Sequence, residues 1–444
     1  MIQLIQSRKR HRVFWETLPR RNFDAQPTIE NDTTLIVVDP TRTYQTHLGF
    51  GGAFSEAAAV MFARTKHQET ALDAYFSSTG LGYNLGRCVI HSSDFSPHSR
   101  TYIDAGDASL QSFSMHDDDA IIIPFIKRAA EKAKGLWLLA SPWSPPAFMK
   151  TNQSLYYGGM LKPEFVEVWA AYIVRYLKGM RDRGLDIAAI SIQNEPEAIQ
   201  TWESCLYTIE QETTMVNALH KALSQTNLSC GIVIWDHNRD RVAQRACGVL
   251  AHASDKVWGI GHHWYVCEAS ENLEVVHDLY PDKHILFTEG CVEYSQHALN
   301  SGSQEENEWK HGEHYGRNII KDSLHHTEGF IDWNLFLDEV GGPNHVENFC
   351  EAPIMIDRTT GALMYQPSYY FIGHFSKHIR PGAKRIHLSL SVTDNVHATS
   401  YKNPDGSVVV VVQNEGSIKQ VVLYMAGQPL NLSLPDRSIT TLIF

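Results

Sequence analysis

The segment IAAISIQNEP (residues 187–196) is an apolar run that ends abruptly in an amide, a carboxylate and a proline. The apolar half has the composition of a buried β-strand. Pro196 has no backbone N–H to donate to a neighbouring strand, so the strand must end just before it. The segment therefore predicts a buried strand that presents a hydrogen-bonding amide, Asn194, and an ionisable acid, Glu195, at its carboxyl end.

Seven further apolar runs of similar length occur along the chain. Together with residues 187–196, the eight runs lie at residues 48–54, 82–90, 136–144, 187–196, 231–238, 257–265, 284–290 and 330–338. The segments between them have helical periodicity, as in residues 163–183, where apolar side chains recur every three or four positions. This alternation predicts a parallel sheet, and eight such units of about 250 residues in total would close a (β/α)₈ barrel. An open, doubly wound sheet is the competing architecture.

Polar residues at the ends of these runs favour the barrel. Nearly every run is apolar at its start and polar at its end, where it carries Arg87, Trp143, Asn194 and Glu195, residues 236–238, residues 262–265, Glu289, and residues 332–334. A barrel gathers the carboxyl ends of all its strands at one face, where active sites of this fold lie. An open sheet brings together only the strands near its switch point. The pattern therefore predicts one cleft to which all eight strands contribute.

The two flanks of the barrel have a different pattern. Residues 1–45 include the apolar run TLIVVD (34–39), and residues 376–444 contain alternating apolar strands around an Asp405-Gly406 turn. We predict an α/β fold in which a TIM barrel spans residues 46–375. A packed all-β side domain, a β-sandwich, is formed by residues 376–444 together with one or more strands from residues 1–45.

Composition and charge limit the partners and the compartment. The chain has 444 residues, 43% of them hydrophobic, and its formal net charge of −12 argues against nucleic acid or an anionic membrane as the main partner. We find no run of 18 apolar residues that would span a membrane, and the first residues lack the apolar core of a signal peptide. Seven cysteines without CxxC pairs are typical of reduced thiols. We therefore expect a cytoplasmic protein.

Two glutamates at strand ends suggest the chemistry. Glu195 ends the fourth run and Glu289 ends the seventh, so a closed barrel would place them across a narrow bore from each other. Paired carboxylates in a cleft suit glycoside hydrolysis, in which one protonates the leaving oxygen. The other attacks the anomeric carbon or activates water, depending on whether about 5–5.5 Å or about 6.5–9.5 Å separates them. The residues alone leave both outcomes open.

Several segments resemble glycoside hydrolase family 30, the glucocerebrosidase-like β-glycosidases. They read, in chain order, HLGFGGAFSEAAA (47–59), GYNLGRCVIHSSDFS (82–96), LLASPWSPPAFMKTN (138–152), SIQNEPEA (191–198), GIGHHWY (259–265), FTEGC (287–291) and IDWNLFLDEVGGPN (331–344). The resemblance extends from about residue 47 to residue 386. It implies a (β/α)₈ barrel with a side β-sandwich, hydrolysis of β-glycosides with retention of configuration, and no cofactor.

The resemblance also implies roles for residues around the two glutamates. Glu195 matches the general acid/base and Glu289 the nucleophile. Asn194 matches the residue that hydrogen-bonds the 2-hydroxyl of the sugar, an interaction that strengthens in the transition state. Tyr265 would hold the carboxylate of the nucleophile, and Arg87 beneath it would keep that carboxylate ionised.

Five further positions match the sugar pocket of the family. Asp94 would accept hydrogen bonds from hydroxyls of the sugar at the nonreducing end, and Trp143 and Trp333 would contact the same sugar. His263 and Asn348 match other substrate-binding positions. Asp94 and Trp143 imply a pocket that binds one terminal sugar, as an exo-acting enzyme requires. The expected substrate is a small β-glucoside, hydrolysed at its terminal β-D-glucosyl residue.

The chain departs from the animal glucocerebrosidases near the leaving-group side. The loop after Glu195 reads AIQTWESCLYTIEQ, and His345 stands where those enzymes have an aromatic residue. These departures, together with the expected absence of a signal peptide, argue against ceramide as the natural leaving group. A β-xylosidase, β-fucosidase or β-1,6-glucanase on the same scaffold remains the alternative, as does a carbohydrate-binding protein without catalysis, which would have no need for both glutamates.

We expect no metal site and no cofactor. Twenty-three histidines invite a metal hypothesis, but His262 and His263 are adjacent in a strand and therefore point to opposite faces. His311 and His314 lie close together in a predicted helix without an evident third ligand. The oligomeric state cannot be read from these patterns.

Overall fold

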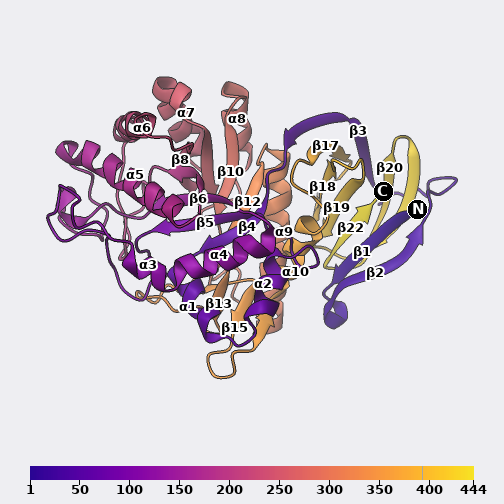
Figure 1. Ribbon diagram of the computed structural model, residues 1–444. Coiled ribbons are helices and arrows are strands. Elements are labelled where there is room, and N and C mark those ends of the chain that lie inside the picture. Colours follow the sequence, from indigo (N-terminus) through magenta and orange to yellow (C-terminus); the bar gives the residue numbers. More distant parts are fainter. Residues whose placement is uncertain (393) are drawn as a thin grey trace.

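The structure, a computed structural model, describes residues 1–392 and 394–444. Figure 1 shows a barrel on one side and a separate β-sandwich on the other. The barrel strands are β4 (Gly49–Phe54), β5 (Leu85–Ile90), β6 (Trp137–Pro142), β7 (Ile187–Ser191), β8 (Gly231–Asn238), β9 (Gly259–His263), β10 (His284–Glu289) and β12 (Gly329–Asn334). Each is parallel to its neighbours, and the barrel closes where β12 pairs with β4. The predicted closed barrel is confirmed, and each of the eight apolar runs overlaps one of its strands.

Helices surround the barrel and follow its strands along the chain. They are α1 (Glu56–Arg64), α2 (Gln68–Phe76), α3 (His116–Ala120), α4 (Ile122–Ala133), α5 (Val166–Asp182), α6 (Ile209–Ser224), α7 (Val242–Ala253), α8 (Glu271–Leu279), α9 (Gln304–Leu324) and α10 (Pro367–Ser376). Helix α5 buries the apolar face that its periodicity predicts, including Trp169, Ile173 and Leu177. In the described part of the chain, no helix combines the length and apolar character that crossing a membrane requires.

The interior of the barrel changes from apolar to polar along the strands. Leu85, Leu139 and Val233 belong to an apolar cluster inside the bore. Side chains alternate between the two faces of a strand, so the residue two positions after Leu85 also points inward. That residue is Arg87, and Ser141 holds the corresponding place after Leu139. The bore thus has an apolar floor under a polar layer, and the active-site face lies above that layer.

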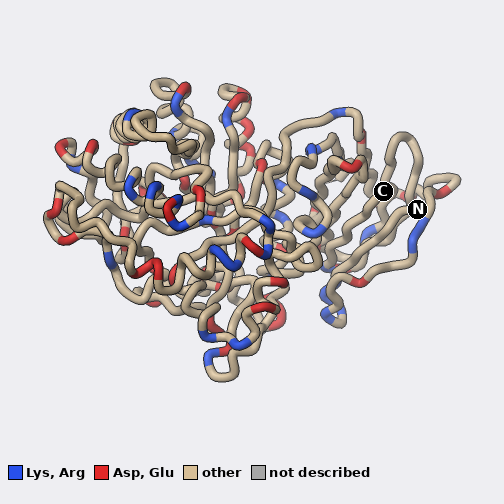
Figure 2. The backbone as a smooth tube through the Cα atoms, viewed as in Figure 1, with Lys and Arg blue, Asp and Glu red and all other residues tan. Residues whose placement is uncertain are grey.

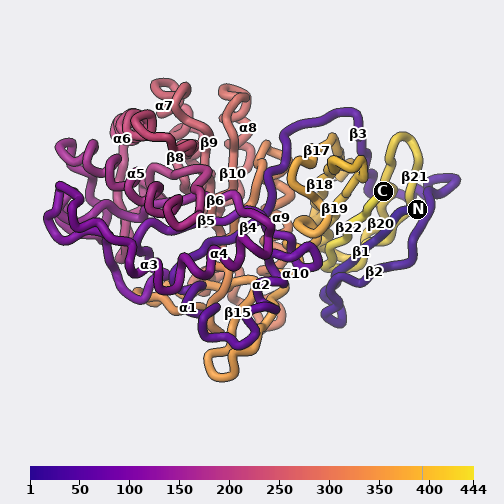
Figure 3. Tube along the Cα trace, in the orientation of Figure 1, coloured from indigo at the N-terminus to yellow at the C-terminus, as the bar shows by residue number. Residues whose placement is uncertain are grey.

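The β-sandwich combines both ends of the chain. Its nine-stranded sheet has the order β2-β1-β22-β19-β18-β17-β3-β20-β21. Figure 3 shows indigo amino-terminal strands beside orange and yellow carboxyl-terminal ones in this part. The strands are β1 (Ile2–Arg8), β2 (Val13–Arg21), β3 (Thr34–Thr46), β17 (Lys384–Leu390), β18 (Val396–Lys402), β19 (Val408–Asn414), β20 (Lys419–Met425), β21 (Gln428–Leu434) and β22 (Ser438–Ile443). Strands β1 and β22 pair directly, so the two chain termini lie close together.

Strand β19 explains why the sandwich packs tightly on the barrel. Its sequence VVVVVQN is buried at every position. Val408, Val410 and Val412 join the core of the sandwich, whereas Val409 and Val411 join the large cluster that also includes barrel helices. A run of five valines is therefore a strand with two buried faces.

Figure 2 shows acidic and basic residues interspersed along the backbone of both the barrel and the β-sandwich.

A buried histidine joins the two parts. His374 of α10 is fully buried, with its Nε2 atom 2.8 Å from Ser7 Oγ and its Nδ1 atom 2.8 Å from Thr441 Oγ1. The Thr441 hydroxyl donates to the backbone carbonyl of His374, so it accepts from Nδ1–H. The Ser7 hydroxyl then donates to Nε2, which defines a neutral imidazole. Burial accordingly lowers the pKa of His374 well below its usual value.

We expect this contact to make stability fall in acid. The unfolded state binds a proton at His374 below pH 6.5, while the folded state does so only at much lower pH. The contribution of neutral His374 to the free energy of unfolding is therefore fully present above pH 6.5. Below that pH it declines by about 1.4 kcal/mol per pH unit. Urea unfolding of His374→Gln at several values between about pH 6 and pH 4.5 should show a shallower decline than the wild type. The exposed His67→Gln is the control, and equal slopes in all three proteins would contradict the assignment.

Candidate active site

One open cavity lies at the carboxyl ends of the barrel strands. Its volume is about 220 Å³, below the range of about 300–1,000 Å³ that is usual for sites of drug-sized ligands. The lining residues come from loops after most of the strands and are Asp94, Trp143, Asn194, Glu195, Ala198, Gln200, Trp202, His237, Asn238, Tyr265, Glu289, Cys291, Glu293, Trp333, Asn348 and Cys350. The two glutamates of the sequence prediction therefore share one cavity.

Glu289 is held on both of its carboxylate oxygens. It is the last residue of β10, and its side chain is almost completely buried. The Tyr265 hydroxyl donates to Oε1 over 2.8 Å, and the Arg87 guanidinium pairs with Oε2. Two donors, one of them charged, fix the orientation of this carboxylate.

Arg87 is the centre of a buried network beneath the cavity. Its side chain is fully buried; it donates to Asp236 Oδ2 and to Asn194 Oδ1, both at 2.8 Å. Burial acts against the charge of Arg87, but Asp236 and Glu289 outweigh it and raise the pKa of Arg87. By holding the Asn194 oxygen, Arg87 leaves the amide nitrogen of Asn194 as the donor available to a ligand. The network thus connects both glutamate-bearing strands.

Asp236 is the counterion that makes this network possible. Ser141 donates to Oδ2 at 2.9 Å and Thr288 donates to Oδ1 at 2.6 Å, in addition to the contacts with Arg87 and His263. Burial alone would raise the pKa of Asp236, but Arg87 and His263 outweigh burial and hold it well below the usual value. A buried carboxylate with this many partners remains ionised.

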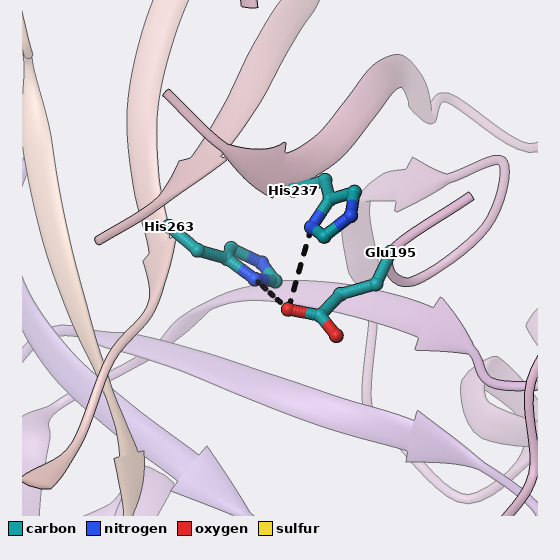
Figure 4. Close-up of side chains that lie close together, drawn as sticks. All are labelled: Glu195, His237 and His263. Atoms are coloured by element: carbon teal, nitrogen blue, oxygen red, sulfur yellow. Dashed lines mark hydrogen bonds and ion pairs between the residues drawn. The ribbon is translucent and has the colours of Figure 1, made fainter. Parts of the chain in front are cut away.

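Two histidines approach one oxygen of Glu195. His263 Nδ1 lies 3.1 Å and His237 Nδ1 3.4 Å from Glu195 Oε1, as Figure 4 shows. Burial raises the pKa of Glu195, but the two histidines outweigh burial and lower it. Burial opposes the charge on His263, while Glu289, Asp236 and Glu195 outweigh burial and raise its pKa to about 9. At neutral pH these shifts place the proton between His263 Nδ1 and Glu195 Oε1 on His263.

The backbone around Glu195 is strained. Glu195 has a φ of 48° and Asp236 a φ of 50°, values in the left-handed region that cost about 1–3 kcal/mol for a residue other than glycine. The N–H of Glu195 donates to the carbonyl of Asp236 over 3.0 Å and that of Asn194 to Pro142 over 2.9 Å. These bonds hold the segment after β7 against both β8 and the end of β6, with Glu195 at the cavity.

Another part of the cavity wall carries an acid with a raised pKa. Asp94 Oδ2 accepts from Asn348 Nδ2 over 3.3 Å and from Asn344 Nδ2 over 3.4 Å. Burial, followed by the charge of Glu289, raises the pKa of Asp94 well above its usual value. A carboxyl group that is easily protonated can both donate to and accept from a sugar hydroxyl.

Aromatic side chains form the remaining walls. The rings of Trp143 and Trp333 stack with centroids 5.1 Å apart, and the Arg87 guanidinium lies 4.9 Å from the Trp143 centroid. The half-buried Trp202 belongs to the segment after Glu195 and lines the same cavity. Flat apolar faces beside hydrogen-bonding groups are suited to sugar rings.

Comparison with known proteins places this arrangement in a family. The model of the glycosyl hydrolase family 30 TIM-barrel domain matches residues 47–379, and that of the glycosyl hydrolase family 30 beta sandwich domain matches residues 382–442. The chain belongs to glycoside hydrolase family 30. The resemblance noted in the sequence is thereby confirmed, and the chain is a glycoside hydrolase with a TIM barrel and a β-sandwich.

Individual relatives of this family 30 chain are similar over most of their length. The lysosomal acid glucosylceramidase of Mus musculus is 34% identical over 423 residues, which cover 90% of this chain and 80% of that protein. An endo-1,6-beta-D-glucanase of Neurospora crassa is 27% identical, with 87% of this chain and 82% of that protein covered. The crystal structure of SrfJ from Salmonella typhimurium has a TM-score of 0.93 at 34% identity and covers 100% of this chain and 99% of that one.

The family 30 site brings together the residues that the sequence singled out. Most of them line the cavity, and Arg87 lies directly beneath it. His263 is fully buried behind Glu195, where its two ring nitrogens face Glu195 and Asp236. As expected for neighbours in a strand, His262 points the other way, to Thr327.

Sequence reasoning missed several members of the site. Asp236 and His237 stood in the polar ending WDHN of the fifth run without receiving a role, and that ending was the available signal. Trp202 and Glu293 also line the cavity. Trp202 lies in a loop and Glu293 in the two-residue strand β11 (Val292–Glu293), and neither segment is long enough for a periodic pattern to indicate which side chains point inward.

Proposed function

We propose that this glycoside hydrolase is a retaining, exo-acting β-glycosidase that removes terminal β-D-glucosyl residues, with Glu289 as nucleophile and Glu195 as acid/base. The observation that carries the proposal is the contrast between the two glutamates of one cavity. Both oxygens of Glu289 are bound by fixed donors, whereas Glu195 makes its contacts through Oε1 on the histidine side. One carboxylate is fixed by donors on both oxygens and the other lies beside two imidazoles, which fits the division into nucleophile and acid/base in retaining hydrolysis.

In the first step a carboxylate oxygen of Glu289 attacks the anomeric carbon of the substrate. The bond from that carbon to the leaving oxygen breaks, and the leaving oxygen takes the proton of Glu195. His263 supplies this proton to Glu195 across the contact between its Nδ1 and Glu195 Oε1, while Asp236 lies against its other ring nitrogen. The product of the step is a glycosyl ester on Glu289.

In the second step water attacks the same carbon. Glu195, now ionised, accepts a proton from the water, and the ester bond to Glu289 breaks. The amide nitrogen of Asn194, oriented by Arg87, is placed to donate to the 2-hydroxyl of the sugar, where hydrogen bonds strengthen in the transition state. Each glutamate returns to its initial state.

Exo action is supported by the part of the cavity wall that carries Asp94. Asp94 is held by Asn344 and Asn348, both from the segment after β12, and it approaches the cavity beside stacked Trp143 and Trp333. A sugar seated between this wall and Glu289 would have its outer hydroxyls bound by Asp94. Its anomeric carbon would then face the two glutamates.

A β-1,6-glucanase is the second candidate. Trp202 lines the cavity on the loop after Glu195, where it offers a flat face to a second sugar. The relative in Neurospora crassa is named as an enzyme of that class. In this case the leaving group of the natural substrate would be another glucose.

A substrate panel distinguishes these functions. We expect the highest kcat/KM among nitrophenyl β-glycosides for the glucoside, ahead of the xyloside, fucoside and galactoside. With a linear β-1,6-linked glucan oligomer we expect glucose as the first product, released from the nonreducing end and detected by chromatography. Longer fragments without early glucose would show endo action, and turnover of only another glycoside would contradict the assigned sugar.

A further inference from the structure

Three side chains at the edge of the cavity form a set of metal ligands. Glu195, His237 and His263 each offer one donor atom, and these atoms all lie within 4.8 Å of one another. They come from three places in the barrel, namely the loop after β7, strand β8 and strand β9, and they point toward a common point in Figure 4. No sequence motif indicates this set, because its members are separated by many residues.

The spacing of the donors fits a transition metal ion. Zn²⁺ binds histidine nitrogen at about 2.0–2.1 Å and carboxylate oxygen at about 2.0–2.2 Å in a tetrahedron, so two of its ligand atoms lie about 3.3–3.5 Å apart. The distances from Glu195 Oε1 to Nδ1 of His263 and of His237 are 3.1 Å and 3.4 Å. An ion can therefore enter with small shifts of the side chains.

The surroundings also match a metal site. His263 Nε2 lies 3.1 Å from Asp236 Oδ1, which gives the carboxylate–histidine pair that commonly orients a metal-binding imidazole through its other nitrogen. Metal binding then replaces the proton on Nδ1 of His263. Nδ1 of His237 is buried and has no hydrogen bond besides its 3.4 Å approach to Glu195 Oε1, and the ring packs beside Trp235 with centroids 5.0 Å apart. This nitrogen therefore has the position of a ligand.

We propose that a divalent transition metal ion of the Zn²⁺ class binds Glu195, His237 and His263 and reversibly inhibits the enzyme. The cavity beside Glu195 and His237 leaves room for water as the fourth ligand. An ion bound to Oε1 prevents the Glu195 carboxylate from exchanging a proton with the substrate. This explanation of the inhibition rests on the proposed role of Glu195 as acid/base. Two imidazoles select zinc, copper, nickel or cobalt over Mg²⁺ and Ca²⁺, which prefer oxygen ligands. The ion is an inhibitor and takes no part in hydrolysis.

Calorimetric titration of the full chain with ZnCl₂ tests the site without relying on activity. We expect one ion per chain, a dissociation constant at least tenfold weaker in His237→Ala and in His237→Gln, and little change in Cys291→Ser. The last variant is the matched control, because Cys291 and Cys350 line the same cavity and thiolates also bind zinc. Melting temperatures show which variants are folded.

Rates measured beside the titration separate this proposal from the proposed function. Zn²⁺ should inhibit wild-type hydrolysis reversibly, Mg²⁺ should not, and EDTA alone should leave the rate unchanged. Absence of zinc binding, or binding that is lost in Cys291→Ser and kept in the two His237 variants, would overturn the metal site. Zinc binding that depends on His237 in a protein without glycosidase activity would support the site and contradict the proposed function.

Discussion

Glu289→Gln should lower kcat/KM for an aryl β-glucoside by roughly 10⁴–10⁶-fold, equivalent to about 5–8 kcal/mol of transition-state stabilisation. The amide has nearly the same shape as the carboxylate and still accepts a hydrogen bond from Tyr265, so the cavity is kept. The substitution removes the negative charge that pairs with Arg87 and that is needed for attack on the anomeric carbon. Initial rates over a range of substrate concentrations measure the loss.

Glu293→Gln is the matched control for this variant. Glu293 is another carboxylate that lines the cavity, but its side chain interacts with Gln296 and Asn348. We expect Glu293→Gln to lose less than about tenfold in kcat/KM, because Glu293 is assigned no contact with the reacting atoms. A tenfold loss corresponds to about 1.4 kcal/mol of transition-state stabilisation. Comparable losses in the two variants, or activity of Glu289→Gln within tenfold of the wild type, would contradict the role of Glu289.

Glu195→Ala should lose about 10²–10⁴-fold with leaving groups that need a proton, since this is the usual contribution of general acid catalysis. With a dinitrophenyl leaving group the first step needs no proton, so the glycosyl ester on Glu289 should accumulate and give a burst of dinitrophenol. Azide fits the space left by the side chain and should restore turnover without needing a base. Stopped-flow absorbance measures the burst and the steady-state rate.

His237→Ala provides the control for azide. It removes a neighbour of Glu195 and leaves the carboxylate in place. Azide should therefore not accelerate this variant by more than about twofold, whereas the acceleration of Glu195→Ala should approach the loss caused by the substitution. Equal responses of the two variants to azide would show that Glu195 is not the acid/base.

The barrel was predictable because one physical pattern repeats along the chain. Each strand of a parallel barrel is buried on both faces, so it reads as an apolar run, and the site must lie where those runs become polar. Glu195 and Glu289 stand at two such transitions. The strand at β19 was also predictable, because a run of five valines is typical of a buried strand.

The role of Asp236 was not predictable, because a local irregularity reverses the pattern of β8. Strict alternation from the inward-facing Val233 would send Trp235 into the bore. The pairing with β9 shifts register between Trp235 and His237, and both Trp235 and Asp236 have positive φ. The irregularity turns Asp236 inward to Arg87 and sends Trp235 outward against Arg245. A bulge of this kind has no reliable signal in a single sequence.

The place of His263 was missed for a related reason. Its position in the sequence indicated a strand end facing the cavity, but the loop that carries Glu195 folds over it. The contact depends on the left-handed backbone at Glu195, a residue type that rarely adopts this conformation. Tertiary contacts between β7, β8 and β9 impose it, and such contacts are not visible in the local sequence.

The configuration of the azide product made by Glu195→Ala tests the central claim most directly. If Glu289 forms the glycosyl ester and azide then attacks that ester, two inversions at the anomeric carbon give β-glucosyl azide, identified by the coupling constant of the anomeric proton in its NMR spectrum. An α-azide would mean a single displacement, with no ester at Glu289, and would contradict the account of these two glutamates.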